Sequence, residues 1–137
     1  MQIEMTIKGL MVDPVTNMPI VVLRDESGDH SLPIWVGVFE ANAIALQIEN
    51  ITPPRPMTHD LLRNVISNFK GTVEKIVISE LKESTFYSFV CIRIGSQVSA
   101  VDSRPSDAIA LALRVGAPIF AEESVVTDAK KAKLNPD

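Results

Sequence analysis

The sequence predicts a single α+β domain in which a mixed or antiparallel β-sheet, or a pair of sheets, packs with three main helices. Polar and apolar side chains alternate over residues 2–12, which is typical of a half-buried strand. Three later segments place apolar residues at helical spacing. The length of 137 residues fits one domain and allows a core without disulfide support. The expected order is three strands, two helices, three strands, a helix, a short strand and a last helix.

The first half of the chain predicts a strand-rich start followed by a helix. In the 2–12 strand, Ile3, Met5, Ile7 and Met11 are expected to share one face. Further strands are expected at 17–24 and 30–36, because turn-forming residues at 25–29 separate two apolar runs. A helix is expected at 38–49, where apolar residues again gather on one side.

A second helix is expected at 58–70, after a stretch that holds three prolines and must be a rigid loop. Thr58 suits the N-cap position of this helix, and Gly71 suits its end. One apolar stripe is expected to face the core. It consists of Leu61, Leu62, Val65, Ile66 and Phe69.

The second half predicts strands at 72–81, 85–94 and 97–101, of which the middle one is apolar on both faces and is expected to be central. A third helix should begin at Pro105 and end at Gly116, and it is apolar nearly all round, as a buried helix is. A short strand at 118–121 and a weak helix at 122–132 complete the chain. The expected domain covers 1–128, with a frayed tail at 129–137.

The composition narrows the classes of function. The net charge of −4 argues against tight non-specific binding to nucleic acid, which favours a basic surface. Apolar residues make up 46%, which for so short a chain predicts a homo-oligomer, a dimer or a multiple of one. The single cysteine, Cys91, allows no internal disulfide, and no signal peptide or membrane span is evident. We therefore expect a cytoplasmic protein that does not enter a membrane.

Two similar polar motifs stand where helices are expected to begin. The first holds Arg55, Thr58, His59 and Asp60, and the second holds Arg104, Ser106 and Asp107. Each combines an arginine, a proline, a hydroxyl and an acid. These residues would serve as caps and as complements to the helix dipole, which is a purely structural role.

The same residues also suit phosphate chemistry. Free N–H groups at a helix start attract phosphate, and Arg55, Arg104, Thr58 and Ser106 would add contacts to it. His59 is a candidate general acid or base. Three carboxylates are candidate catalytic groups and ligands of Mg²⁺ or Mn²⁺, which prefer oxygen. They are Asp60, Asp107 and Glu40, the last in the first turn of the 38–49 helix.

Four separated blocks of the sequence resemble the bifunctional nuclease family, a mainly bacterial and plant group. They are Leu32–Gly37, Glu40–Ile44, Arg55–Leu62 and Arg104–Ala112. The resemblance runs from the first strand to about Val126. It implies cleavage of both DNA and RNA with the aid of a divalent metal.

Three hypotheses follow for the function. The first is a metal-assisted phosphodiesterase that uses the residues above. The second is a non-catalytic regulatory module in which the same groups bind an anion or a partner. The third is a structural oligomeric domain whose polar motifs tie helix ends together. If the two helix starts line one open cleft, the first two hypotheses are favoured. Burial of the same groups in mutual salt bridges would favour the third.

Overall fold

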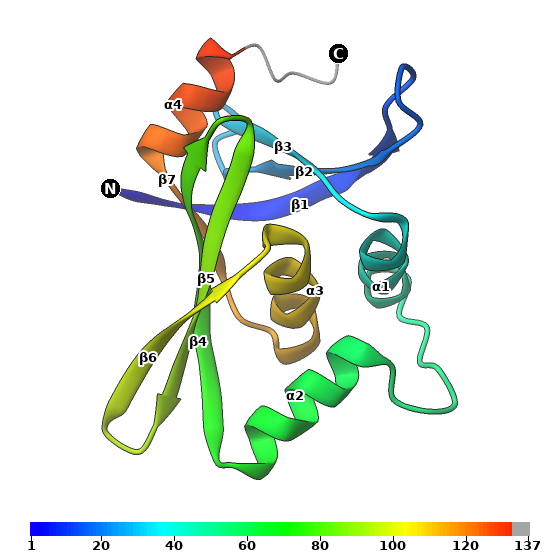
Figure 1. Cartoon of the computed structure of the whole chain (residues 1–137), viewed down its shortest axis with the longest axis vertical. Coiled ribbons are helices and arrows are strands. Elements are labelled where there is room, and N and C mark those ends of the chain that lie inside the picture. Colours follow the sequence, from blue (N-terminus) through cyan, green and yellow to red (C-terminus); the bar gives the residue numbers. More distant parts are fainter. Residues whose placement is uncertain (133–137) are drawn as a thin grey trace.

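The computed structural model describes residues 1–132 and confirms the α+β class. Figure 1 shows the arrangement of its elements. In chain order the described elements are β1 (Gln2–Val12), β2 (Pro19–Arg24), β3 (Ser31–Trp35), α1 (Val38–Ile48), α2 (Thr58–Asn68), β4 (Gly71–Lys82), β5 (Thr85–Ile94), β6 (Gln97–Ser103), α3 (Pro105–Val115), β7 (Ile119–Glu122) and α4 (Glu123–Lys131).

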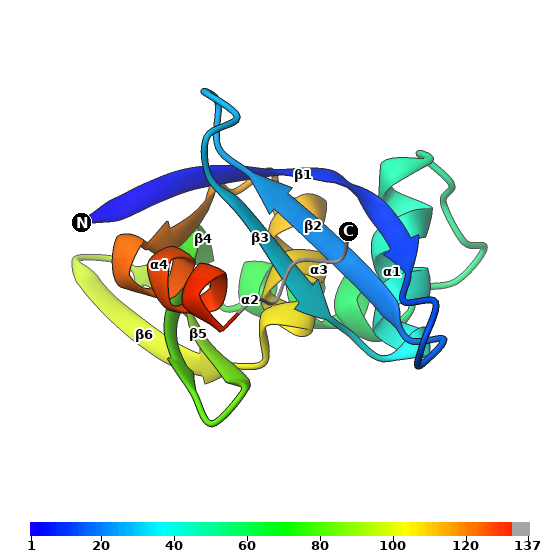
Figure 2. The same ribbon diagram turned by 90° about the horizontal axis from the view of Figure 1, so that it is seen from above.

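The strands of residues 1–132 form one seven-stranded mixed sheet in the order β3-β2-β1-β7-β4-β5-β6. The short strand β7 joins the two halves, because it pairs antiparallel with β1 and parallel with β4. The sheet twists strongly, so that β1–β3 run across the direction of β4 and β5 (Figures 1 and 2). The strand β5 has a neighbour on each side, as expected of an interior strand, but the middle of the sheet is β7.

A β-bulge in β1 changes which side chains face the core. The pairing register with β2 shifts between Ile7 and Gly9. An extra residue in one strand reverses the alternation beyond it. Met5 is buried as expected, whereas Met11 lies on the exposed side and Leu10 takes a half-buried position. The prediction that Met11 shares the face of Met5 is therefore wrong.

The helix α3 is the centre of the fold, and its predicted burial is confirmed. Residues from Pro105 to Ala112 are buried apart from Asp107. Gly116 ends the helix with a φ of 71°, the left-handed conformation that glycine adopts without strain. The helices α1 and α2 pack against α3, while α4 packs against β3, β4 and β7 at the other end of the molecule (Figure 1).

Most of the apolar stripe of α2 is exposed, contrary to the sequence prediction, and of its five residues Ile66 alone packs against the core as expected. The exposed fraction is 58% for Leu61 and 74% for Phe69, and Leu62 and Val65 are also exposed. The residues that α2 buries are His59 and Asp60. Spacing identifies the residues that share a helix face, but it does not identify the neighbour of that face. In α2 the polar face meets α3.

The ends of α2 also differ from the prediction. Thr58 is the first helical residue and not the N-cap, which is Met57. The carboxylate of Asp60 replaces the expected hydroxyl cap and accepts a hydrogen bond from the backbone N–H of Met57 at 2.9 Å. After the helix, Lys70 takes the left-handed conformation. Gly71 already belongs to β4, where an added Cβ would lie 2.9 Å from a methyl carbon of Ile66.

The last helix, α4, extends beyond Asp128, where the domain was expected to end. It reaches Lys131, and Ala129 is buried in the core. The predicted tail therefore overlaps the end of this helix, and its residues 133–137 lie outside the described part of the chain. Among the helices of residues 1–132, none has the length and apolarity that crossing a membrane requires.

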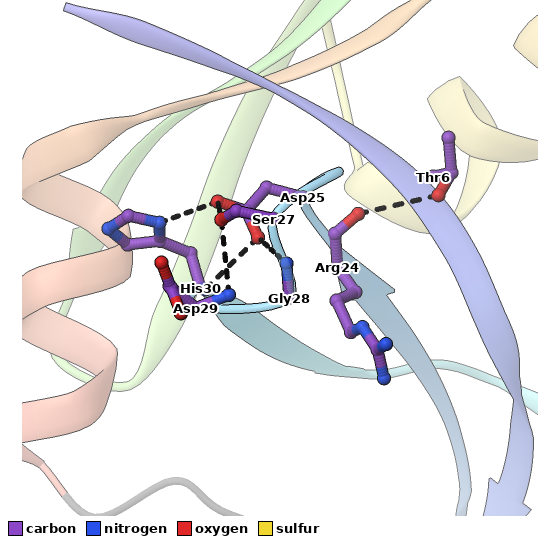
Figure 3. A network of polar contacts seen from close by, with 7 residues as sticks. All are labelled: Thr6, Arg24, Asp25, Ser27, Gly28, Asp29 and His30. Atoms are coloured by element: carbon purple, nitrogen blue, oxygen red, sulfur yellow. Dashed lines mark hydrogen bonds and ion pairs between the residues drawn. The ribbon is translucent and has the colours of Figure 1, made fainter.

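The turn between β2 and β3 is organised by one carboxylate, that of Asp25 (Figure 3). It accepts hydrogen bonds from the backbone N–H groups of Gly28 and His30 at 2.9 and 3.1 Å, and from the Ser27 hydroxyl at 3.0 Å. It also lies 2.6 Å from Nδ1 of His30. These contacts, above all that with the His30 ring, lower the pKa of Asp25 from 3.8 to about 2.

We predict that Asp25→Asn destabilises the protein at neutral pH but not in strong acid. A carboxyl whose pKa is lower in the folded state stabilises the fold above its unfolded pKa, 3.8, and loses that effect as the pH falls through about 2. Urea unfolding at several pH values should show a gap between wild type and variant that closes between these two pH values. Asp29→Asn is the control, because hydrogen bonds from residues 1–132 do not reach the Asp29 carboxylate. Parallel stability curves for wild type and Asp25→Asn across this range would contradict the prediction.

Candidate active site

The starts of α2 and α3 meet in space, although their contacting residues lie 48 positions apart in the sequence. Nε2 of His59 lies 2.8 Å from Oδ1 of Asp107. The side chain of His59 is largely buried, and that of Asp107 is partly exposed. The two motifs that the sequence placed at helix starts therefore form one cluster.

Arg104 completes this cluster and links it to α1. Its Nε donates to Oδ2 of Asp107 at 2.9 Å, and its Nη2 lies 2.9 Å from the same oxygen. Nη2 also lies 3.7 Å from Oε2 of Glu40. The hydrogen bond to Asp107 raises the pKa of Arg104, so the guanidinium stays charged. Its third nitrogen, Nη1, makes no hydrogen bond or ion pair with residues 1–132, and the side chain as a whole is 67% exposed.

The hydrogen bond to Asp107 fixes the state of the His59 ring. A carboxylate can only accept, so the proton of the neutral imidazole lies on Nε2. Nδ1 then carries the lone pair. Within residues 1–132 it has no hydrogen-bond partner, and because it is not a fully buried atom it keeps some contact with solvent. A histidine that a carboxylate orients, with its other nitrogen free, is the arrangement of a general base.

The cluster lies in a groove of about 670 Å³ between α1, α2 and the start of α3, hereafter the groove. The polar residues His59, Arg104, Asp107 and Glu40 line it, with Thr58 beside them. Its remaining walls are largely apolar and include four large side chains, those of Phe39, Leu61, Leu62 and Val65. Such a groove can hold flat apolar groups, with the polar cluster setting their orientation.

Asp60 does not join this cluster. Its Oδ1 lies 2.7 Å from Nε of Arg114, in the last turn of α3, and its other oxygen accepts from Met57. The hydrogen bond from Met57 and then the Arg114 guanidinium lower the pKa of Asp60. Arg114 is 1% exposed and also donates to the carbonyl oxygens of Ala110 and Ala43. Asp60 thus forms a buried ion pair with Arg114.

Sequence reasoning did not include Arg114 among the site residues. The sequence did single out this residue, since Arg114 is the one charged residue after the first turn of an otherwise apolar helix. A charge in such a helix needs a partner. Two other predicted residues lie elsewhere: Ser106 is buried beside a separate cavity, and Arg55 lies on the far side of the α2 start from the groove.

The three predicted metal ligands do not come together. Asp60 pairs with Arg114, while Glu40 and Asp107 flank the guanidinium of Arg104. Both oxygens of Asp107 already have partners. Within residues 1–132, no group of three or more His, Cys, Asp or Glu side chains is placed to hold a metal ion. This donor set does not fit the expected Mg²⁺ or Mn²⁺ site.

Comparison with known proteins identifies relatives along most of the chain. A model of the bifunctional nuclease domain matches residues 21–133. A protein of Mycobacterium tuberculosis, named only as uncharacterized, is 44% identical over 126 residues. That alignment covers 92% of this chain and 75% of the relative.

More distant relatives occur in rice. The protein named bifunctional nuclease 1 of Oryza sativa subsp. japonica is 27% identical over 110 residues, and the one named bifunctional nuclease 2 is 28% identical over 122 residues. These alignments cover 78% and 86% of this chain but only 33% and 38% of the rice proteins.

We predict that Asp60→Asn lowers the free energy of unfolding by about 3–5 kcal/mol, because it leaves the buried Arg114 charge without its counter-ion. The matched control is Glu74→Gln, which removes one partner of the surface pair between Glu74 and Arg93. Its loss should stay within about 1 kcal/mol. Chemical denaturation at neutral pH measures both values. Similar losses for the two variants would show that the Asp60–Arg114 pair contributes no more than a surface contact.

Proposed function

Since the chain belongs to the bifunctional nuclease domain family, we propose that it hydrolyses phosphodiester bonds of DNA and RNA in the groove. The observation that carries the proposal is the His59–Asp107 contact at 2.8 Å, with Nδ1 of His59 left open. It gives the groove a general base whose ring orientation and tautomer are fixed. Arg104 lies beside it with free donors.

His59 acts on the attacking group. Nδ1 takes a proton from a water molecule as the water oxygen forms a bond to phosphorus. The P–O bond to the leaving oxygen then breaks, and the imidazolium can return its proton to that oxygen. Asp107 stabilises the imidazolium, because a carboxylate next to Nε2–H lowers the energy of the positive ring.

Arg104 acts on the phosphate. Its Nη1 can donate to a non-bridging oxygen, on which negative charge grows in the transition state. Asp107 and Glu40 hold the guanidinium in place, and they also neutralise much of its charge. The two carboxylates carry one negative charge more than Arg104 can balance. The reaction therefore depends on His59, because the positive charge that it gains with the proton balances this excess.

A metal-assisted reaction was the expectation from the sequence. The donor geometry does not support a site built from Asp60, Asp107 and Glu40, so the steps above use only side chains of the chain. Metal dependence remains a prediction, and cleavage assays should include Mg²⁺, Mn²⁺ and a chelator as separate conditions.

We predict that His59→Gln lowers the cleavage rate by about 10²–10⁴-fold, the usual contribution of a general base. Glutamine can still donate to Asp107, but it cannot take the proton. The rate should be measured on a short single-stranded substrate and divided by the folded fraction from thermal melting, because His59 is buried and contributes to packing.

His30→Gln is the control for His59→Gln, since His30 is the other histidine of the chain and lies in the β2–β3 turn. It should cleave as wild type does. Equal cleavage per folded molecule by His59→Gln and wild type would remove this histidine from the mechanism.

A second proposal concerns assembly, and the exposed stripe of α2 favours it. Leu61, Leu62, Val65 and Phe69 expose an apolar helix face, and Phe39 of α1 adds an exposed ring beside it. Exposed apolar patches of this kind mark interaction surfaces. We propose that a second copy of the chain covers the end of this stripe around Phe69, which lies outside the groove. The interfaces of homodimers are more apolar than the average surface.

We predict a dimer, or a multiple of it, in light scattering at micromolar concentration. Phe69→Glu should shift the population toward monomer, and Tyr87→Glu, at an exposed position of β5, should not. Phe69 does not line the groove, so its replacement tests assembly without altering the candidate active site. A wild-type mass near 15 kDa would contradict the prediction.

A further inference from the structure

We propose that a second cavity, on the other side of the α2 start, binds a phosphate group. This cavity, hereafter the arginine pocket, has a volume of about 210 Å³. The proline-rich loop before α2 forms one side of it, and Arg55, Asp60, Arg63 and Arg114 line the rest. None of the residues assigned to cleavage in the groove lines the arginine pocket, so this inference goes beyond the proposed reaction.

The arginine pocket has an excess of positive charge. Of its three arginines, Arg114 already has a partner for each of its three nitrogens, namely Asp60 and two backbone carbonyls. Asp60 is the one carboxylate in the lining. Within residues 1–132, Arg55 and Arg63 have no carboxylate within ion-pair distance, and Arg63 makes only a 3.3 Å hydrogen bond through Nε to Asn64. Two positive charges therefore remain unbalanced in a protein whose net charge is −4.

The walls of the arginine pocket are stiff. Arg55 stands between Pro54 and Pro56, and Pro53 precedes them. Proline fixes its own φ and restricts the residue before it, so this loop has few conformations. The opposite wall is the buried Asp60–Arg114 pair, which is tied to the backbone of α1 and α3. A rigid site loses little conformational entropy when it binds a ligand.

The size and chemistry of the arginine pocket favour phosphate. Its volume lies below the range of about 300–1,000 Å³ that is typical of pockets for drug-sized ligands. Guanidinium groups donate pairs of hydrogen bonds in a fork that matches the oxygens of phosphate. The groove offers less to an anion, because its one arginine lies between two carboxylates. The phosphate can be the free ion or part of a nucleic acid.

Binding of radiolabelled inorganic phosphate to the full chain, by equilibrium dialysis at constant ionic strength, tests the proposal. Wild type should bind in a saturable manner. Arg55→Gln and Arg63→Gln should each weaken binding about 10-fold or more, since a hydrogen bond to a charged group contributes about 1.5–3 kcal/mol. Arg93→Gln is the control, because Arg93 lies on β5 and pairs with Glu74. It should bind as wild type does.

Competition then identifies the source of the phosphate. Displacement by a 5′-phosphorylated oligonucleotide but not by its 5′-hydroxyl form supports recognition of a chain end. Displacement by both forms supports recognition of the backbone, and displacement by neither supports the free ion. Wild type that does not bind phosphate in a saturable manner would overturn the proposal. So would binding that both Arg55→Gln and Arg63→Gln leave unchanged while circular dichroism shows them folded. These readouts measure binding alone, so they stand whether or not His59→Gln affects cleavage.

Discussion

Two consecutive residues, His59 and Asp60, fasten the start of α2 across α3, and the functional surface depends on this polar attachment. His59 contacts Asp107 in the first turn of α3, and Asp60 contacts Arg114 in the last. Successive side chains on a helix point in different directions. One helix start therefore reaches both ends of its neighbour, and the groove and the arginine pocket form on the two sides of the attachment.

The attachment consists of charged and polar groups, which has consequences for both stability and specificity. A buried ion pair adds little net stability over apolar packing, because both charges must leave water. It does demand one geometry, however, since displacement of either partner leaves a buried charge. Because polar contacts hold α2 in place, its apolar stripe is left free on the surface. The same attachment explains the orientation of His59 and the exposure of Phe69.

Much of the fold could be predicted from the sequence, because local patterns specify it. Alternation identified β1, and the nearly continuous apolar run of α3 identified its burial. The failures arose where a side chain depends on a distant neighbour. The bulge between Ile7 and Gly9 reversed the exposure of Met11, and the partner of Asp60 lay at Arg114, 54 residues away. The orientation of α2 belongs to the same class, since it is determined by contacts with α3.

The candidate site was predictable in its members but not in its grouping. His59, Arg104, Asp107 and Glu40 do share one groove, whereas Asp60 and Arg55 lie on the other side of the α2 start. A single sequence shows which residues suit phosphate chemistry, but not which of them meet. The separation gives the two sides different properties: the groove holds a histidine oriented by a carboxylate, and the arginine pocket holds unbalanced positive charge.

The central claim is that Asp107 orients His59 and leaves Nδ1 free. Nitrogen-15 NMR of the histidine rings measures this directly, because the chemical shifts of the two ring nitrogens report which one carries the proton. For the neutral ring of His59 we expect the proton on Nε2 in wild type, and a mixture of both forms in Asp107→Asn. A wild-type ring protonated on Nδ1, or a proton position that Asp107→Asn leaves unchanged, would contradict the account.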